Sequence, residues 1–331
     1  MTNRRSFIQL LAAATSLPAL GASSVRAQTA NVVRIINGFP SGGVVDAVSR
    51  RVGEGMTGTD YASSVVVENR TGAGGRLACV AAKGAPADGN TLLLTPDTVL
   101  TLYPVIYSKL DYDPFKDLLP VSTVAATTDA LAVGPLVPEQ IRTVRDFLAW
   151  SKSNPQHASY GSPGTGSPLH LLGSLLSREG DTNLKHIPYR GAAPGVTELM
   201  GGQIAAMLAP TGNFLAAYRA GKLRILGTSG LKRTPFTPDI PTFSEQKYAG
   251  DYPAEDQWFG FFAPRGTQAT AIAKAHAAIQ LALNNQRTVE SLATLGMVAS
   301  RSSPDGMRSS LAIQHEKWGA LVKRLGFTAE S

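Results

Sequence analysis

The chain has 331 residues, 43% of them apolar, which is enough for two domains with complete hydrophobic cores. Its formal charge is +7, from 31 basic and 24 acidic residues, and removal of Arg4, Arg5 and Arg26 with the N-terminal segment lowers the basic count to 28. The remaining excess is mild and shows no basic run with interleaved aromatics. This argues against nucleic acid as a partner and supports an anionic ligand only weakly.

The first 27 residues are typical of a secretory signal peptide. A basic start ends at Arg4-Arg5, an uncharged and mostly apolar segment covers 7–22, and small residues surround a predicted cleavage after Ala27. The apolar segment is too short to span a bilayer, which needs roughly 20 residues. The twin arginine, followed by one polar and two apolar residues, fits twin-arginine export, and an ordinary secretory signal is the alternative. Either route predicts a periplasmic protein.

Short apolar strands alternate with helical stretches along the mature chain. This alternation predicts the α/β class, with mostly parallel sheets covered by helices on both faces. The predicted strands cover 32–36, 65–67, 92–94, 131–133, 203–208, 224–226 and 258–262. The predicted helices cover 44–56, 77–83, 144–150, 168–176, 194–200, 271–283, 289–295 and 304–325.

The chain contains no low-complexity linker, and two passages, near Ala126 and Ala254, are candidate crossings between domains. We therefore predict a discontinuous first domain, made of 28–126 and 254–331, and a second domain over 127–253. Cys79 is the only cysteine, so a disulfide within the chain is excluded. Its apolar neighbours favour a buried thiol over a reactive one.

Three glycine-rich loops each follow a strand or extended segment and open a helix. Helix starts carry free N–H groups and a partial positive charge that attract anions, and glycine lets a ligand approach the backbone closely. Any one loop has an ordinary tight turn as its alternative, but three together favour an anion site. The candidate ligand-binding residues in and just after these loops are Phe39, Ser41, Gly42, Gly43, Asp46, Ser162, Thr165, Gly166, Ser167, His170 and Arg190.

Three of these side chains allow two interpretations each. Arg190 could pair with a ligand carboxylate through its planar fork of donors, or lie on the surface beside a turn. Asp46 could contact a ligand amine, but a structural role in the first turn of its helix is favoured. His170 could reach the ligand from the first turn of its helix, and a structural histidine is the equal alternative.

The sequence lacks the arrangements expected of an enzyme. None of the five histidines has metal-ligand spacing, and no nucleophile elbow of the G-x-S-x-G type is present. We therefore expect no catalysis, no metal and no cofactor. An exported hydrolase acting on a carboxylic ester is the alternative from another class.

The chain resembles the Bug family, the extracytoplasmic solute receptors of tripartite tricarboxylate transporters, over essentially the whole mature chain. The segments that carry the resemblance occur in order: Phe39-Pro40-Ser41-Gly42-Gly43 with Asp46, Val67-Glu68-Asn69-Arg70, Gly72-Ala73-Gly74-Gly75, Pro86-Ala87-Asp88-Gly89, Tyr112-Asp113-Pro114, Ser162 to His170, Pro188-Tyr189-Arg190-Gly191, Gly201-Gly202-Gln203, Ala220-Gly221-Lys222-Leu223-Arg224 and Trp258-Phe259-Gly260.

This resemblance implies a two-domain periplasmic binding protein fold of type II, with a ligand cleft between the domains. It implies a small carboxylate ligand held largely by backbone groups and waters, and transporter subunits in the membrane as partners. A ligand-sensing receptor not coupled to transport is the alternative. The resemblance places the Ser41-Gly42-Gly43 and Thr165-Gly166-Ser167 loops on opposite sides of the cleft. It also adds Thr95, Asp97 and Thr98 to the lining.

The chain departs from the family pattern in two places. Members often have small or hydroxyl residues at the positions of Pro96 and Asp97, and the Asp97 carboxylate opens the alternative of an amine-bearing or less anionic ligand. Members often carry acidic residues after the Gly202-Gln203 pair, where this chain has alanine and leucine. These departures bear on the ligand class more than on the fold.

Overall fold

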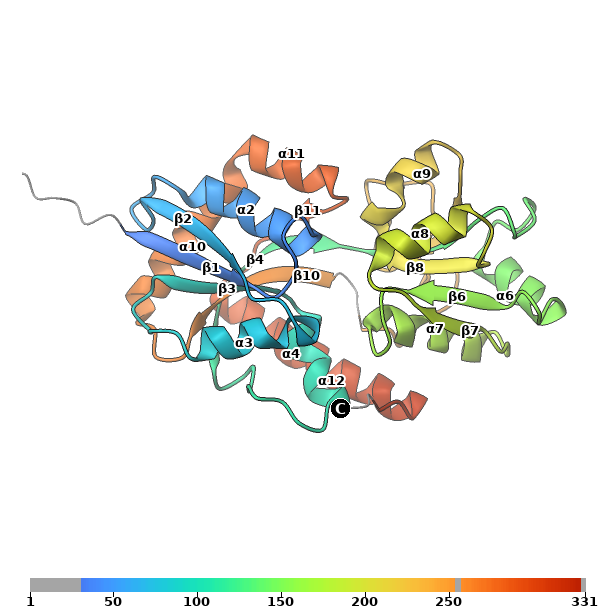
Figure 1. Ribbon diagram of the computed structural model, residues 1–331, viewed down its shortest axis with the longest axis horizontal. Helices are drawn as coiled ribbons and strands as arrows, with labels where there is room; N and C mark the ends of the chain where they lie inside the picture. Colours follow the sequence, from blue (N-terminus) through green and yellow to red (C-terminus); the bar gives the residue numbers. More distant parts are fainter. Residues whose placement is uncertain (1–30, 254–256, 329–331) are drawn as a thin grey trace, which may run out of the picture. The chain divides into compact units, whose positions relative to one another are not determined.

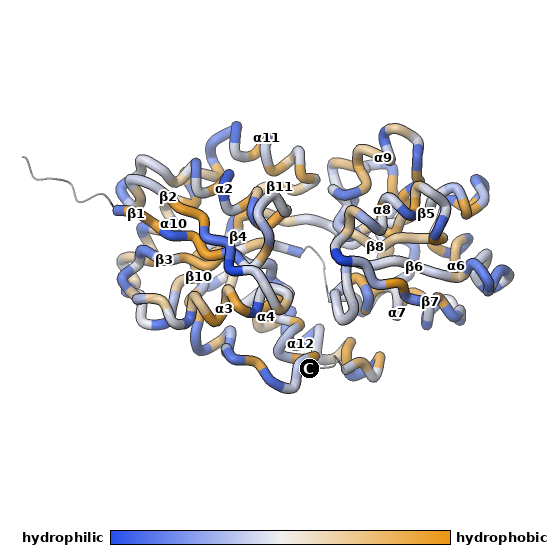
Figure 2. Tube along the Cα trace, viewed as in Figure 1, coloured by the Kyte–Doolittle hydropathy of each residue, from blue (hydrophilic) through white to orange (hydrophobic). Residues whose placement is uncertain are grey.

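A computed structural model of the protein describes residues 31–253 and 257–328. The predicted signal peptide lies outside the described residues. Within the described ranges the chain forms two β-sheets, of six and five strands, each packed against helices (Figure 1). Hydrophobic stretches are concentrated in the strands, while many loops are hydrophilic (Figure 2).

The first sheet has the strand order β11-β4-β10-β3-β1-β2. Strands β1, β2 and β3 run parallel, whereas β10 is antiparallel to both β3 and β4. The strands are β1 (Val32–Asn37), β2 (Ser64–Asn69), β3 (Thr91–Pro96), β4 (Leu118–Thr127), β10 (Gln257–Pro264) and β11 (Val298–Ala299).

Helices cover both faces of the first sheet. Successive side chains along a strand point to opposite faces, and both faces of this sheet are apolar. Ile35 packs in the core beneath α2 (Val44–Met56), α10 (Ala269–Asn284) and α11 (Gln286–Thr294). The next residue, Ile36, packs in the opposite core. That core is covered by α3 (Arg76–Lys83), α4 (Thr98–Thr101) and the first half of α12 (Pro304–Leu325); a short α5 (Tyr103–Ile106) follows α4.

The second sheet has the strand order β7-β6-β8-β5-β9. Leu131 and Val133 of β5, the strand next to β9 at one edge, pack against α6 (Val144–Ser153) and α7 (Pro168–Glu179), whereas Ala130 and Ala132 pack against α8 (Ala192–Met200) and the region of α9 (Leu215–Arg219). The strands are β5 (Asp129–Val133), β6 (Ser159–Ser162), β7 (Lys185–Pro188), β8 (Ala206–Pro210) and β9 (Arg224–Thr228).

The chain changes sheet between Thr127 and Asp129, and returns between Thr228 and Gln257. The crossings expected near Ala126 and Ala254 stay a prediction: Ala126 lies in β4, one residue before that strand ends, and Ala254 lies outside the described residues. The limits of the two domains stay a prediction, since α12 belongs to both cores.

Helix α12 contributes side chains to the cores of both sheets. Met307 and Leu311 are buried with residues of α3 and β10, whereas Trp318 and Leu321, further along the helix, are buried with residues of β5 and α7. Its 22 residues span about 33 Å at 1.5 Å per residue. Like the other helices in the described part of the chain, α12 is not apolar enough to cross a bilayer.

One predicted strand needs correction. The strand expected over 203–208 begins only at Ala206 and continues to Pro210. The reason is the turn after α8, in which Gly202 adopts a φ of +70° and the N–H of Gln203 donates to Glu198 O at 3.0 Å. Gln203 is therefore held at the helix end.

Gly173→Ala should destabilise the second sheet's half of the molecule by about 1–3 kcal/mol. A methyl group at Gly173 would lie 2.0 Å from the ring of Tyr160, which is buried and cannot move aside. Gly319→Ala is the matched control, because Gly319 lies in the interior of α12 with no atom within 4 Å of the added carbon. The control should gain up to about 1 kcal/mol. Urea unfolding would measure both, and equal effects would contradict the argument.

Candidate ligand site

The parallel strands of the first sheet bring three loops to one edge. Asn37 pairs in register with Asn69 of β2 and with Leu94 of β3, so the segments that follow these strands lie next to one another. In open α/β sheets, ligands bind at the carboxyl ends of the strands. The first predicted loop and the segment from Thr95 to Thr98 both lie at this edge.

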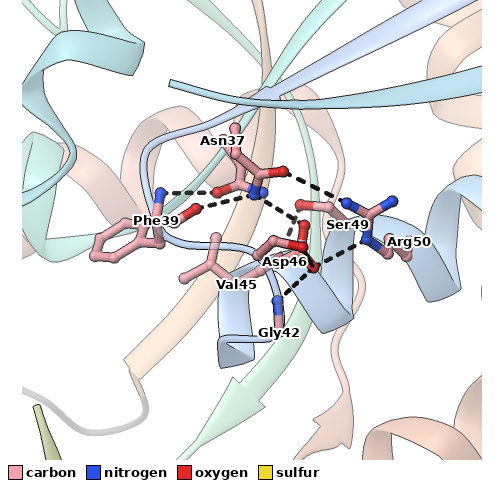
Figure 3. Close-up of polar contacts among 9 residues, drawn as sticks. Asn37, Phe39, Gly42, Val45, Asp46, Ser49 and Arg50 are labelled. Carbon is pink, nitrogen blue, oxygen red and sulfur yellow. Dashed lines mark hydrogen bonds and ion pairs between the residues drawn. The ribbon is translucent and has the colours of Figure 1, made fainter. Parts of the chain in front are cut away.

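Asp46 holds the first loop in place, as Figure 3 shows. Its Oδ2 accepts hydrogen bonds from Gly42 N and Arg50 Nε, both at 2.9 Å, and its Oδ1 accepts one from Asn69 Nδ2 at 2.9 Å. Burial alone would raise the pKa of Asp46, but the hydrogen bonds from Arg50, Gly42 and Asn69 lower it to about 2. Both carboxylate oxygens thus have partners within the protein, and these hydrogen bonds give Asp46 a structural role. A ligand contact by Asp46 stays a prediction.

The exposed part of the first loop lies at the start of α2. Ser41 and Gly42 are exposed, and Gly42 has a φ of +80° with open space around it. Gly43 is the N-cap of α2, and no side chain caps the helix. The first turn of α2 therefore offers backbone N–H groups next to an accessible surface.

The Gly72–Gly75 segment, which was not predicted to belong to the site, packs against the first loop. A methyl group at Gly38 would lie 2.5 Å from Gly75 Cα, so the two backbones approach too closely for any side chain at Gly38. The glycine run itself is visible in the sequence. The contact with Gly38 is not, because 37 residues separate the two positions.

The second sheet brings the other two predicted loops together. Ser162 of β6 pairs with Pro188 of β7 in a parallel register, so the segments after both strands share one edge. Ser167, which precedes Pro168, caps α7 by accepting the His170 N–H at 3.2 Å. Thr165 and Arg190 are exposed at this edge. Helix α8 begins after Gly191, which has a φ of +102°, without a side-chain cap.

A cluster of two histidines and a serine supports the second loop. Ser162 Oγ lies 2.8 Å from His186 Nε2, and the rings of His186 and His170 stack with centroids 3.8 Å apart. Gly166 N donates to His170 Nδ1 at 3.1 Å, which fixes this nitrogen as an acceptor and the ring as neutral. Burial lowers the pKa of His170, and burial together with His170 lowers the pKa of His186 to about 4. The sequence analysis found His170 and missed His186.

The predicted residues differ in how accessible they are. Phe39, Gly43, Ser167 and His170 are partly exposed, and Gly166 is buried. The side chains of Thr95, Asp97, Thr98 and Ser162 are buried, with Asp97 only 2% exposed. Asp97 faces the interior, where Gln314 Nε2 donates to its Oδ2 at 2.8 Å once the Gln314 amide is oriented to match its neighbours. That the two groups of loops face each other across a cleft stays a prediction.

No group of three His, Cys, Asp or Glu side chains that could hold a metal occurs within 31–253 and 257–328.

The profile of the tripartite tricarboxylate transporter family receptor matches residues 48–327 of the chain. The chain belongs to this receptor family.

Solved structures support the assignment of family and fold. The periplasmic binding protein BugD is 29% identical, with a TM-score of 0.77, over 90% of this chain and 99% of its own. MatC from Rhodopseudomonas palustris, solved with bound malate, is 27% identical, with a TM-score of 0.75 and coverages of 88% and 98%. Rpa4515 of R. palustris, solved with adipate, is 25% identical, with a TM-score of 0.78 and coverages of 89% and 97%. The resemblance to the Bug family and the two-domain periplasmic binding fold are therefore confirmed.

Proposed function

We propose that this receptor captures a small carboxylate-bearing molecule in the periplasm and delivers it to the membrane subunits of a tripartite transporter. The observation that carries this proposal is that α2 and α8 both begin after glycine residues without a side-chain cap. Their first N–H groups and the positive ends of the helix dipoles suit a carboxylate. The family relatives MatC and Rpa4515 were solved with malate and adipate, which are both dicarboxylates.

The exposed side chains at the two sheet edges complement this role. The hydroxyl groups of Ser41 and Thr165 can donate to carboxylate oxygens, and the guanidinium of Arg190 can bind one in a bidentate manner. The stacked pair of His170 and His186 contributes no positive charge near neutral pH, because both pKa values are lowered. Selectivity for an anion would then come from backbone dipoles and Arg190.

The Ser162–His186 pair is the observation closest to a hydrolase. A general base works best with a pKa near the operating pH, and the pKa of His186 is lowered to about 4. Ser162 is fully buried, and its Oγ also lies 3.1 Å from the carbonyl oxygen of Gly164, to which it can donate. This geometry suits a rigid support for the loop better than a nucleophile, and it favours binding without turnover.

Thermal unfolding of the mature protein against dicarboxylates, aromatic carboxylates and amino acids tests the proposal. A ligand at 100 times its Kd should add about 2.7 kcal/mol to the free energy of unfolding. Thr165→Glu, which adds a negative charge at the exposed loop, should weaken binding of the best carboxylate at least tenfold, about 1.4 kcal/mol. Ser309→Glu, on an exposed turn of α12, is the charge-matched control and should bind normally.

Two outcomes would contradict the proposal. One is the absence of stabilisation by every carboxylate in the panel. The other is hydrolysis of a carboxylic ester by the purified protein that disappears in Ser162→Ala, which would revive the enzyme alternative.

A further inference from the structure

The backbone of Asp129 is anchored in the second sheet, directly after the chain leaves the first. Strand β4 pairs with β10 in the first sheet up to the partners Thr127 and Gln257. Asp129 then opens β5, where its N–H donates to Ser229 Oγ at 2.8 Å and its carbonyl accepts the Ser229 N–H at 2.7 Å. This short connection is one of the places where the chain passes directly from one sheet to the other.

The side chain of Asp129 reaches the segment along which the chain returns. Its Oδ2 accepts hydrogen bonds from the Tyr252 hydroxyl at 2.9 Å and from Gln257 Nε2 at 2.8 Å. Gln257 is the first residue of β10, so it belongs to the first sheet. One carboxylate oxygen thus links the outgoing connection to residues of the returning one.

A second buried carboxylate, Asp97, lies on the other side of β10. Its N–H donates to the carbonyl of Trp258 at 2.9 Å, next to Gln257. Asp97 and Asp129 are 2% and 0% exposed, and the Oδ1 atom of each is buried without a hydrogen-bond partner among the described residues. A buried carboxylate oxygen that lacks a partner is costly when it carries charge, and two such groups raise that cost for each other.

Within 31–253 and 257–328 no ion pair reaches either carboxylate. Among the described residues, the titratable groups that act on the two carboxylates are Asp129, which acts on Asp97, and Tyr252, which acts on Asp129. Burial raises the pKa of Asp129 to about 7, and burial followed by the charge of Asp129 raises that of Asp97 well above its usual range.

Water has a place to enter beside this cluster. Tyr252 lines a cavity of about 440 Å³ together with Asp251, Lys317 and Arg324, and Arg324 is ion-paired with Asp251.

We propose that the Asp97–Asp129 pair is a proton-dependent latch between the two sheets. Protonated, the pair keeps the Tyr252–Asp129–Gln257 bridge dry and intact. When the pair is fully ionised, it draws water into the connection and frees the two sheets to move.

This latch goes beyond the proposed function and does not depend on which ligand binds. It makes the opening of the receptor sensitive to pH near neutrality even if the ligand itself does not titrate there. The sign follows from linkage. Because the folded pKa of Asp129 is raised, its stabilising contribution is full below about pH 4 and is lost as the pH rises through 7.

Hydrogen exchange of the ligand-free protein tests the latch. Protection factors, corrected for intrinsic exchange, are compared between pH 5.5 and 8 for peptides covering 124–131 and 252–260. Protection in the natural protein should fall about tenfold or more across this range. Asp129→Asn should remove the pH dependence. Asp60→Asn, at an exposed aspartate, is the control and should leave the dependence unchanged.

Two further variants make the test directional, including the case in which Asp129→Asn does not fold. Tyr252→Phe removes a donor to the ionised carboxylate and should move the midpoint to higher pH. Asp97→Asn should leave the transition in place, because the pKa of Asp129 is raised to about 7 by its own burial. A midpoint moved to higher pH in Tyr252→Phe supports the latch, and an unchanged or lower midpoint overturns it. Because no ligand is present, the result stands apart from the success or failure of the carboxylate-binding proposal.

Discussion

Trp318→Ala should lower the free energy of unfolding by about 3–5 kcal/mol, the largest effect expected of a single substitution in this chain. Trp318 is 1% exposed and is the largest fully buried side chain. It lies on the second half of α12, in the core of the second sheet, and its ring meets that of Tyr252 edge-on with centroids 5.4 Å apart. Its loss leaves a cavity where the helix joins that core.

Chemical unfolding combined with hydrogen exchange would measure this loss and locate it. Protection should fall more in β5 and α7 than in β1 and β3, because Trp318 contacts the second core and not the first. Trp150→Ala is the matched control, since Trp150 is only partly buried on α6 and stacks on Phe147 at 6.1 Å. Equal losses in both variants would show that α12 is not an essential part of the second core.

Asp46→Ala should cost about 3 kcal/mol and disorganise the loop that precedes α2. The substitution removes the acceptor of three hydrogen bonds and leaves the Gly42 N–H without its acceptor and the Asn69 Nδ2 group with only its hydrogen bond to Phe39 O. Hydrogen bonds to a charged acceptor contribute about 1.5–3 kcal/mol each, although the three are not additive. Asp181→Asn is the control, because this exposed carboxylate pairs only with exposed Lys152 among the described residues. It should cost less than about 1 kcal/mol.

The same carboxylate gives the protein an acid-sensitive element. The folded pKa of Asp46 is lowered to about 2, so its contribution is present above about pH 4 and is lost as the pH falls through 2. A difference of nearly two pKa units corresponds to about 2.5 kcal/mol. The stability of Asp46→Asn should therefore decline less between pH 4 and 2 than that of the natural protein. Parallel declines would show that Asp46 is not the group responsible.

The strands that the sequence predicted are those with a clear local signal. The run Val65–Val67 is apolar and β-branched, and the run Leu92–Leu94 is apolar and follows turn residues. In the structure each strand begins one residue earlier and ends two residues later than predicted. Strand β4 was missed although it has ten residues. It contains Pro120, whose pairing with Phe262 lies at a register irregularity, where a strand can accommodate proline. Small and hydroxyl residues are mixed along β4, so its sequence shows no regular alternation of apolar and polar side chains.

Strands β6 and β7 were missed for a different reason. Each has four residues, and Ser159 and Lys185 begin them with polar side chains. They form strands because β6 pairs with β8 and β7 pairs with β6, and no local pattern reveals these hydrogen-bond partners. The pairing of β10 with β4 is likewise invisible to local patterns, because β10 joins the first sheet about 130 residues after β4.

In the candidate site, too, residues with a local sequence signal were predicted and their distant partners were not. Glycine, serine and proline mark the helix starts, so Gly42, Gly43 and Ser167 were found from local chemistry. The partners that hold them were not. Asn69 reaches Asp46 across 23 positions, and His186 reaches Ser162 across 24. Such pairs are created by parallel strands that share an edge, and a single sequence does not show which strands are neighbours.

The thiol of Cys79 makes this receptor convenient to convert into a fluorescent reporter. Cys79 is fully buried, and burial raises the pKa of its thiol to about 12, so it presents almost no thiolate to a labelling reagent. It is also the only cysteine in the sequence. A cysteine introduced at exposed Thr165 would accept a maleimide dye without any prior removal of native thiols. Ligand capture could then be followed as a change in emission from a single, chemically defined position.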